Sequence, residues 1–215
     1  MTNITPAEHM RQTIALMELT PATASGLLRQ DWQQQPWKNH EMVKAALHNM
    51  GFQLLGVGSY STVWALPDDP HVVKLVQDDP CFLRFAEYCN ANRANPHVPR
   101  MGRVMRWPGA DDGEALVFTE RLQPLRLPLD LYHQMERYLN AQRSGRPAAA
   151  ENTRFAEEHP GLARTLDELA AIFAPARHCD VDMGPANFMQ RGDGTIVITD
   201  PFSTNGKDPV PYGKG

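Results

Sequence analysis

The sequence has few cysteines and no long apolar run. Its 215 residues include three cysteines, Cys81, Cys89 and Cys179, and none belongs to a Cys-x-x-Cys pair. This usage fits a reducing cytoplasm better than a disulfide-stapled secreted protein, and it matches no zinc motif. No stretch approaches the roughly 18 consecutive apolar residues of a membrane span, and the N-terminus lacks the apolar run of a signal peptide. We therefore expect a cytoplasmic protein with no membrane partner.

An excess of positive charge is also missing. The chain carries 21 Lys and Arg residues against 25 Asp and Glu residues, which gives a formal net charge of −4. A protein that works mainly by neutralising nucleic-acid phosphates needs the opposite balance, so we expect no direct nucleic-acid binding. With 42% apolar and 21% charged residues the composition is that of an ordinary globular protein. We therefore expect the function to depend on a local site and not on the overall charge or composition.

The first part of the chain has the apolar spacing of helices, and the next has the composition of a small sheet. A helix is predicted from Thr5, a second near 24–29, and a third from Asn39 to the stop at Gly51. Runs rich in β-branched and aromatic residues then alternate with turn sequences such as GVGS and PDDP, and predict three antiparallel strands, a helix and a strand pair. These segments are, in order, 52–55, 60–66, 72–76, the helix 80–91, 104–107 and 115–118.

After Pro128 the chain becomes mainly helical, and it ends in a strand pair. The helices are expected over 131–139 and 162–173, and the strands over 188–190 and 195–199. A mainly β part followed by a mainly α part predicts an α+β fold. The expected parts are a helical N-terminal extension over 1–50, a β lobe over 51–122 and a helical lobe over 123–215. The extension either packs on the β lobe or recognises a partner.

Two elements of the β lobe carry residue types suited to phosphate binding. The first turn contains Gly56, Gly58 and Ser59, and glycines let main-chain N–H groups approach phosphate oxygens closely. The third strand carries Lys74, whose aliphatic stem can pack on the sheet while its ammonium acts as a point charge for phosphates. Taken alone, the glycines are better explained as an ordinary hairpin turn. An exposed strand position explains the lysine equally well.

A third element lies near the end of the chain. Asp182 precedes Asn187 by five residues, and Asp200 follows the last predicted strand pair. This spacing supplies a candidate base and two oxygen ligands for Mg²⁺, a hard cation that prefers oxygen donors. A loop with solvent-facing acids is the alternative. The occurrence of all three elements in this chain order favours a functional interpretation.

The order of these motifs resembles the signature of the protein-kinase-like superfamily. The segments GVGSYSTVW, VVKLV, LVFTERL, DMGPANFM and ITDPFS match its Gly-rich loop, strand lysine, hinge, catalytic loop and Mg²⁺-binding Asp. Within this superfamily, the motif sequences are most similar to those of the early serine/threonine protein kinases of short-tailed (autographivirus-type) bacteriophages, over roughly residues 37–205. The resemblance implies a minimal bilobal kinase-like fold. It also implies a phage-encoded kinase that uses ATP and Mg²⁺ and phosphorylates host proteins in the host cytoplasm.

The resemblance gives each matching residue a role. Asp182 would accept the proton of the substrate hydroxyl, while Asn187 and Asp200 would bind Mg²⁺. The reaction would be in-line transfer of the γ-phosphoryl group, catalysed mainly by positioning and charge neutralisation. ATP would contact the phosphate-binding residues Gly56, Gly58, Ser59 and Lys74 and, in the hinge 117–122, Glu120 and Leu122.

Some assignments stay open. Asp180 ends a His-Cys-Asp triplet that superficially matches the kinase His-Arg-Asp, but only Asp182 has the required spacing to Asn187. Glu87 is the nearest candidate for an ion pair with Lys74, although a solvent-facing helix position explains it equally well.

Two other functions fit parts of the sequence. A small-molecule phosphotransferase also dispenses with the activation segment, which the residues after Asp200 do not match. A catalytically inactive kinase-like protein that binds and inhibits a host enzyme fits Gly184, which occupies the position of the catalytic-loop lysine. Against inactivity stands the retention of Lys74, Asp182, Asn187 and Asp200.

Overall fold

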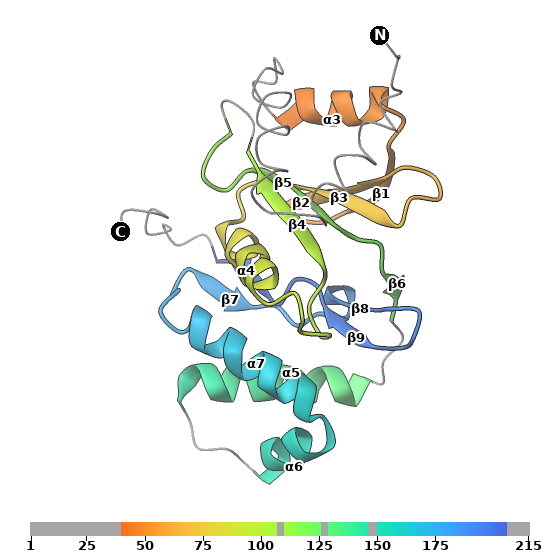
Figure 1. The fold of residues 1–215 in the computed structure, drawn as a ribbon. Helices are drawn as coiled ribbons and strands as arrows, with labels where there is room; N and C mark the ends of the chain where they lie inside the picture. Colours follow the sequence, from red (N-terminus) through yellow and green to blue (C-terminus); the bar gives the residue numbers. More distant parts are fainter. Residues whose placement is uncertain (1–39, 107–109, 126–128, 146–149, 206–215) are drawn as a thin grey trace. The chain divides into compact units, whose positions relative to one another are not determined.

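The computed structural model describes residues 40–106, 110–125, 129–145 and 150–205 (Figure 1). Five α-helices and several antiparallel strand pairs lie in these ranges, which confirms the α+β class. The helices predicted from Thr5 and near 24–29 lie outside the described residues, as does the last residue of the strand predicted at 104–107. None of the described helices combines the length and the apolarity needed to cross a lipid bilayer.

The chain forms two compact units, and each interleaves with the other along the sequence. Within the described ranges, unit 1 comprises 40–90 and 100–121, and unit 2 comprises 91–99 and 122–205. The helix at the end of the predicted extension thus belongs to the same unit as the sheet. The segment 91–99, assigned from the sequence to the β lobe, belongs to unit 2.

Unit 1 is built on a five-stranded antiparallel sheet with strand order β1-β2-β3-β5-β4 (Figure 1). The three consecutive strands, the helix after them and the following strand pair are all confirmed. The elements of unit 1 are α3 (His40–Asn49), β1 (Gln53–Val57), β2 (Ser61–Ala65), β3 (His71–Val76), α4 (Pro80–Ala91), β4 (Met101–Met105) and β5 (Ala115–Glu120).

Helix α3 supplies one side of the hydrophobic core of unit 1. Its Val43 and Leu47 are completely buried, and burial of such side chains is worth about 1.5–3 kcal/mol each. The helix ends at the predicted glycine, since Gly51 has φ +87° and donates its N–H to His48 O at 2.9 Å. The apolar cluster consists of Val43, Leu47, Phe52, Trp64, Leu66, Val73, Leu75, Met105, Leu116 and Phe118.

The start of helix α4 is fixed by a capped turn. Asp79 is 4% exposed, and its Oδ1 accepts a hydrogen bond from Phe82 N at 3.0 Å, as an N-cap residue does. Asp79 N donates in turn to Gly113 O at 3.1 Å. The chain packs so closely here that a Cβ atom on Gly113 would lie 2.7 Å from Asp78 Cα. The β4–β5 connection therefore holds the first turn of α4 in place.

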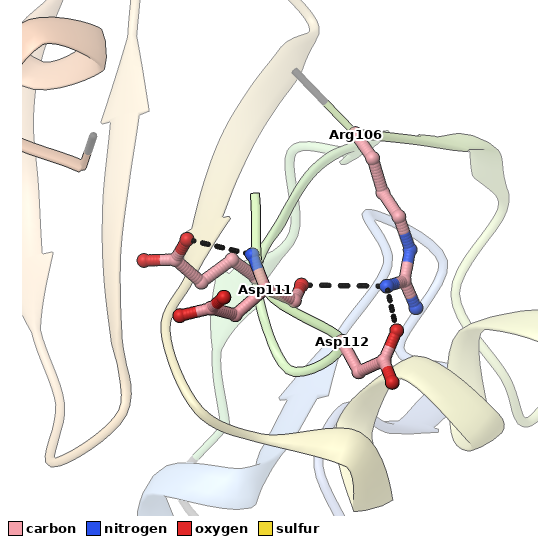
Figure 2. Close-up of polar contacts among 4 residues, drawn as sticks. Arg106, Asp111 and Asp112 are labelled. Carbon is pink, nitrogen blue, oxygen red and sulfur yellow. Dashed lines mark hydrogen bonds and ion pairs between the residues drawn. The ribbon is translucent and has the colours of Figure 1, made fainter. Parts of the chain in front are cut away.

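Exposed polar contacts shape this connection (Figure 2). Arg106 Nη1 donates to Asp111 O at 3.3 Å and to Asp112 Oδ1 at 3.2 Å, and Asp111 N donates to Glu114 Oε2 at 3.1 Å. The Arg106 and Asp112 side chains are 38% and 78% exposed, so their ion pair contributes little to stability. Its effect is to shape the turn that presents Gly113 to Asp79.

Unit 2 contains three helices, α5 (Leu129–Ser144), α6 (Ala150–Glu158) and α7 (Pro160–Phe173). Helices α5 and α7 confirm the two predicted helices. Helix α6 was not predicted, because Phe155 is the one buried apolar side chain in its polar sequence. That ring packs against Tyr138 of α5, with the ring centroids 5.0 Å apart.

Short strands complete unit 2 in two small antiparallel sheets, β6-β8-β9 and β10-β7. The pair β8 and β9 confirms the last predicted hairpin. Strands β6, β7 and β10 were not predicted, because each is short and pairs with a strand distant in the sequence. The bounds are β6 (Gln123–Pro124), β7 (Cys179–Val181), β8 (Phe188–Gln190), β9 (Ile196–Ile198) and β10 (Phe202–Thr204), with a 3₁₀ turn at Pro185–Asn187.

The segment 91–99 is bound to the β8–β9 hairpin of unit 2. His97 O accepts a hydrogen bond from Ile198 N, and His97 Nδ1 lies 2.9 Å from Ile196 O. The Arg191 guanidinium donates to the carbonyls of Pro96 and Val98. These bonds make the segment an integral part of this unit.

Candidate functional site

Main-chain hydrogen bonds in unit 2 bring Asp182, Asn187 and Asp200 together. On one side of Asp200, Pro201 O accepts a bond from Asp182 N at 2.9 Å. On the other side, Thr199 N donates to Asn187 O, also at 2.9 Å. The main chain that carries Asp200 is therefore bonded to both other segments, and the three side chains leave the backbone close to one another.

The Asn187 side chain is oriented by the loop itself. Its Nδ2 donates to Asp182 O at 2.8 Å, and its main-chain N donates to Gly184 O at 2.9 Å across the 3₁₀ turn. Because the amide nitrogen and oxygen share one carbon, the first bond also fixes the direction of Oδ1. Oδ1 of Asp200 is shielded from solvent. An amide oxygen and a carboxylate are donors that Mg²⁺ accepts, so these two residues fit such an ion.

The Asp182 carboxylate is exposed at the end of a well-anchored loop. The next residue, Met183, is 5% exposed and attaches the loop to unit 2. A Cβ atom on Gly184 would lie 3.5 Å from Asp182 Oδ1, in van der Waals contact. Glycine at this position thus leaves one carboxylate oxygen more accessible, as a group that accepts a proton from a substrate needs to be.

The other acid of this region has a structural partner. Asp180 lies in β7, and its Oδ1 accepts a hydrogen bond from Asn205 Nδ2 at 3.0 Å. The same amide donates to Arg177 O, and Asn205 N donates to His178 O. Asp180 therefore helps to join the residues after β10 to those before β7. This engagement favours Asp182 as the candidate base.

A row of residues crosses the sheet of unit 1 and contains two of the predicted phosphate-binding residues. Gly56 pairs with Val63, Val63 with Lys74, and Lys74 with Val117. Residues directly opposite one another in antiparallel strands share a face. The alternate positions, among them Trp64, belong to the core under α3, so the row lies on the other face. Val63, half-buried between the glycine and the lysine, was not singled out from the sequence.

The glycines of the first turn are not required by the backbone. Strand β1 continues through Gly56, and the turn closes with a bond from Gly58 N to Ser61 O at 2.8 Å. Neither glycine has a positive φ. A Cβ atom on Gly56 would meet nothing within 4 Å, and one on Gly58 would make ordinary contact with Ser61. Ser59 follows in the same turn and is exposed.

Lys74 lies beside helix α4. Its Nζ is 3.5 Å from the centroid of the Phe82 ring, in the first turn of that helix. Glu87, the acidic partner considered from the sequence, is an exposed residue five positions further along α4.

The two predicted hinge residues belong to different units. Glu120 ends β5, where its Oε1 accepts a bond from Arg100 N at 2.8 Å and its N donates to Arg100 O. The Glu120 carboxylate thus holds the start of β4. Leu122 begins the second segment of unit 2, which follows Arg121, and it is half-buried.

No protein-family model matches the chain, and no curated protein matches it. The function is therefore inferred from the residues and their geometry.

Proposed function

We propose that this protein is a serine/threonine protein kinase that uses ATP and Mg²⁺. In this proposal unit 1 is the N-lobe and unit 2 is a reduced C-lobe of a minimal kinase-like fold. The observation that carries it is the pair of main-chain bonds on either side of Asp200, which gathers a candidate base and two oxygen ligands in one place. The proposed substrates are proteins of a bacterial host, phosphorylated in its cytoplasm by a phage-encoded enzyme.

Each residue of the proposed site has one task. Asn187 and Asp200 would hold Mg²⁺, which neutralises charge on the transferred phosphoryl group. Asp182 would accept the proton of the attacking hydroxyl group, because its carboxylate is exposed at the same point. In unit 1, Lys74 would contact the α- and β-phosphates, and the Gly56–Ser59 turn would cover them.

The turn glycines support this proposal. A hairpin needs glycine where φ is positive or where a Cβ atom would collide, and neither condition holds at Gly56 or Gly58. Their presence is explained if a ligand approaches the main chain there, since a Cβ atom would then obstruct it. An ordinary turn of this geometry does not require glycine at either position.

The test is incubation of the purified protein with γ-labelled ATP, Mg²⁺ and a bacterial lysate, followed by separation of proteins from small molecules. Labelled protein supports the proposal. Label confined to a small product identifies a small-molecule phosphotransferase instead. Nucleotide binding with no transfer to either fraction identifies an inactive kinase-like binding protein.

A matched pair of variants assigns the base. Asp182→Asn should lower transfer by about a hundredfold or more, because an amide cannot accept the proton. Asp180→Asn makes the same chemical change two residues away, and its amide oxygen can still accept the bond from Asn205. It should retain activity. Equal loss in the two variants, or normal transfer by Asp182→Asn, contradicts the assignment.

A further inference from the structure

The contact between Lys74 and Phe82 places a positive charge against an aromatic face. Lys74 lies in the middle of β3, and Phe82 lies in the first turn of α4. The distance of 3.5 Å from Nζ to the ring centroid is well inside the range of about 6 Å over which a ring quadrupole attracts a cation. The ammonium is thus held from the side of the helix.

The Phe82 ring is itself held firmly. Its side chain is 1% exposed, and its main-chain N donates to the buried carboxylate of Asp79. Phe85, one turn further along α4, packs against it with the ring centroids 6.3 Å apart. A ring with this little freedom can define the position of a flexible lysine side chain.

An aromatic partner has a different effect on the ammonium from that of a carboxylate. The ring attracts the charge without carrying a compensating negative charge of its own. It also offsets the unfavourable field at the start of α4, where the helix dipole disfavours cations. An ammonium held in this way keeps its formal charge, the property that attracts it to anionic oxygens.

We infer that Phe82 is a positioning residue for Lys74, holding its ammonium on the sheet face that carries Gly56 and Val63, where it meets the nucleotide phosphates. The role given to Lys74, binding the nucleotide phosphates, rests on the proposed function. The contact between Lys74 and Phe82 does not. The two parts are accordingly tested by separate measurements.

The contact is tested by NMR on the protein without nucleotide. The chain has five lysines, Lys38, Lys44, Lys74, Lys207 and Lys214, so reductive ¹³C-methylation, which keeps the charge, gives a simple spectrum. Lys74→Arg identifies the Lys74 signal, which should be shifted upfield by the ring current. Phe82→Leu should return it to the position of an ordinary lysine.

Phe85→Leu is the matched control. It makes the same change in the same helix at a side chain that is also completely buried, so the two variants should lose similar stability. Phe85→Leu should leave the Lys74 signal shifted. An unshifted signal in the natural protein, or equal loss of the shift in both variants, overturns the inference.

The purpose of the contact is tested by steady-state kinetics below the melting temperature of both variants. Phe82→Leu should raise KM for ATP about tenfold, equivalent to about 1.4 kcal/mol, with kcat changed by less than about threefold, because ground-state and transition-state binding weaken together. Phe85→Leu should leave KM within about twofold of the natural value. Equal rises in KM indicate a merely structural role and overturn the positioning role. A shifted Lys74 signal in a protein that binds no ATP means that the proposed function fails while the contact stands.

Discussion

Replacement of Gly113 by alanine should destabilise unit 1 strongly. The added Cβ atom would lie 2.7 Å from Asp78 Cα and 3.0 Å from both Asp78 C and Asp79 N, and all three are main-chain atoms. Main-chain atoms cannot move aside by a side-chain rotation. The β4–β5 connection must therefore withdraw from the start of α4.

The magnitude follows from two contributions. Overpacking a tight contact costs about 1–3 kcal/mol. Withdrawal also weakens the hydrogen bond from Asp79 N to Gly113 O, which is worth about 0.5–1.5 kcal/mol. Together they predict a loss of about 2–4 kcal/mol from a typical total of about 5–15 kcal/mol.

The assay is chemical denaturation of Gly113→Ala beside Gly56→Ala, in the same unit. A Cβ atom on Gly56 meets nothing within 4 Å, so this control should change the free energy of unfolding by less than about 1 kcal/mol. A loss of less than about 1 kcal/mol in Gly113→Ala, or equal losses in the two variants, refutes the steric reasoning.

Three further predictions concern the proposed site and α3. Gly56→Ala should raise KM for ATP several-fold at unchanged stability, and an unchanged KM would remove the glycine argument. Asn187→Ala should raise the Mg²⁺ concentration needed for half-maximal phosphoryl transfer, measured by titration. Burial, and after it the positive charge of Lys44, lower the pKa of His40. The negative charges of Glu114 and Glu41 act in the opposite direction and are outweighed. The unfolded chain then binds protons more readily, so stability should be lost as the pH falls from about 6.5 towards the lower pKa of the folded state. Thermal unfolding from pH 7 to 5 should show this loss in the natural protein and a smaller one in His40→Leu.

Local signals in the sequence were sufficient for the longer elements. Helix α4 has the bounds 80–91 that were predicted for it, and the structure shows its start fixed by the Asp79 cap. The end of α3 followed from Gly51, which has the positive φ that a helix stop requires. Helix α6 and strands β7 and β10 had no comparable signal, since their stability comes from packing and pairing within unit 2.

The candidate site was predictable as residues but not as an arrangement. Spacing pointed to Asp182, Asn187 and Asp200, yet their proximity depends on the β7–β10 pairing and the bond between Thr199 and Asn187, which no linear motif encodes. Phe82 could not be found from the sequence at all. A phenylalanine in an apolar helix predicts core packing. Its contact with Lys74 is known only from the distance between the ring and Nζ in the structure.

The interleaving of the two units has a consequence for biosynthesis. The chain passes from one unit to the other three times, after residues 90, 99 and 121. When Arg121 leaves the ribosome, every described strand of the five-stranded sheet is available for pairing, but the segment 91–99 is still without Arg191, Ile196 and Ile198. That loop stays open until the β8–β9 hairpin is synthesised. A fragment that ends at Arg121 therefore carries the segment 91–99 without its hydrogen-bond partners. Unit 1 expressed on its own needs a short linker in place of that segment.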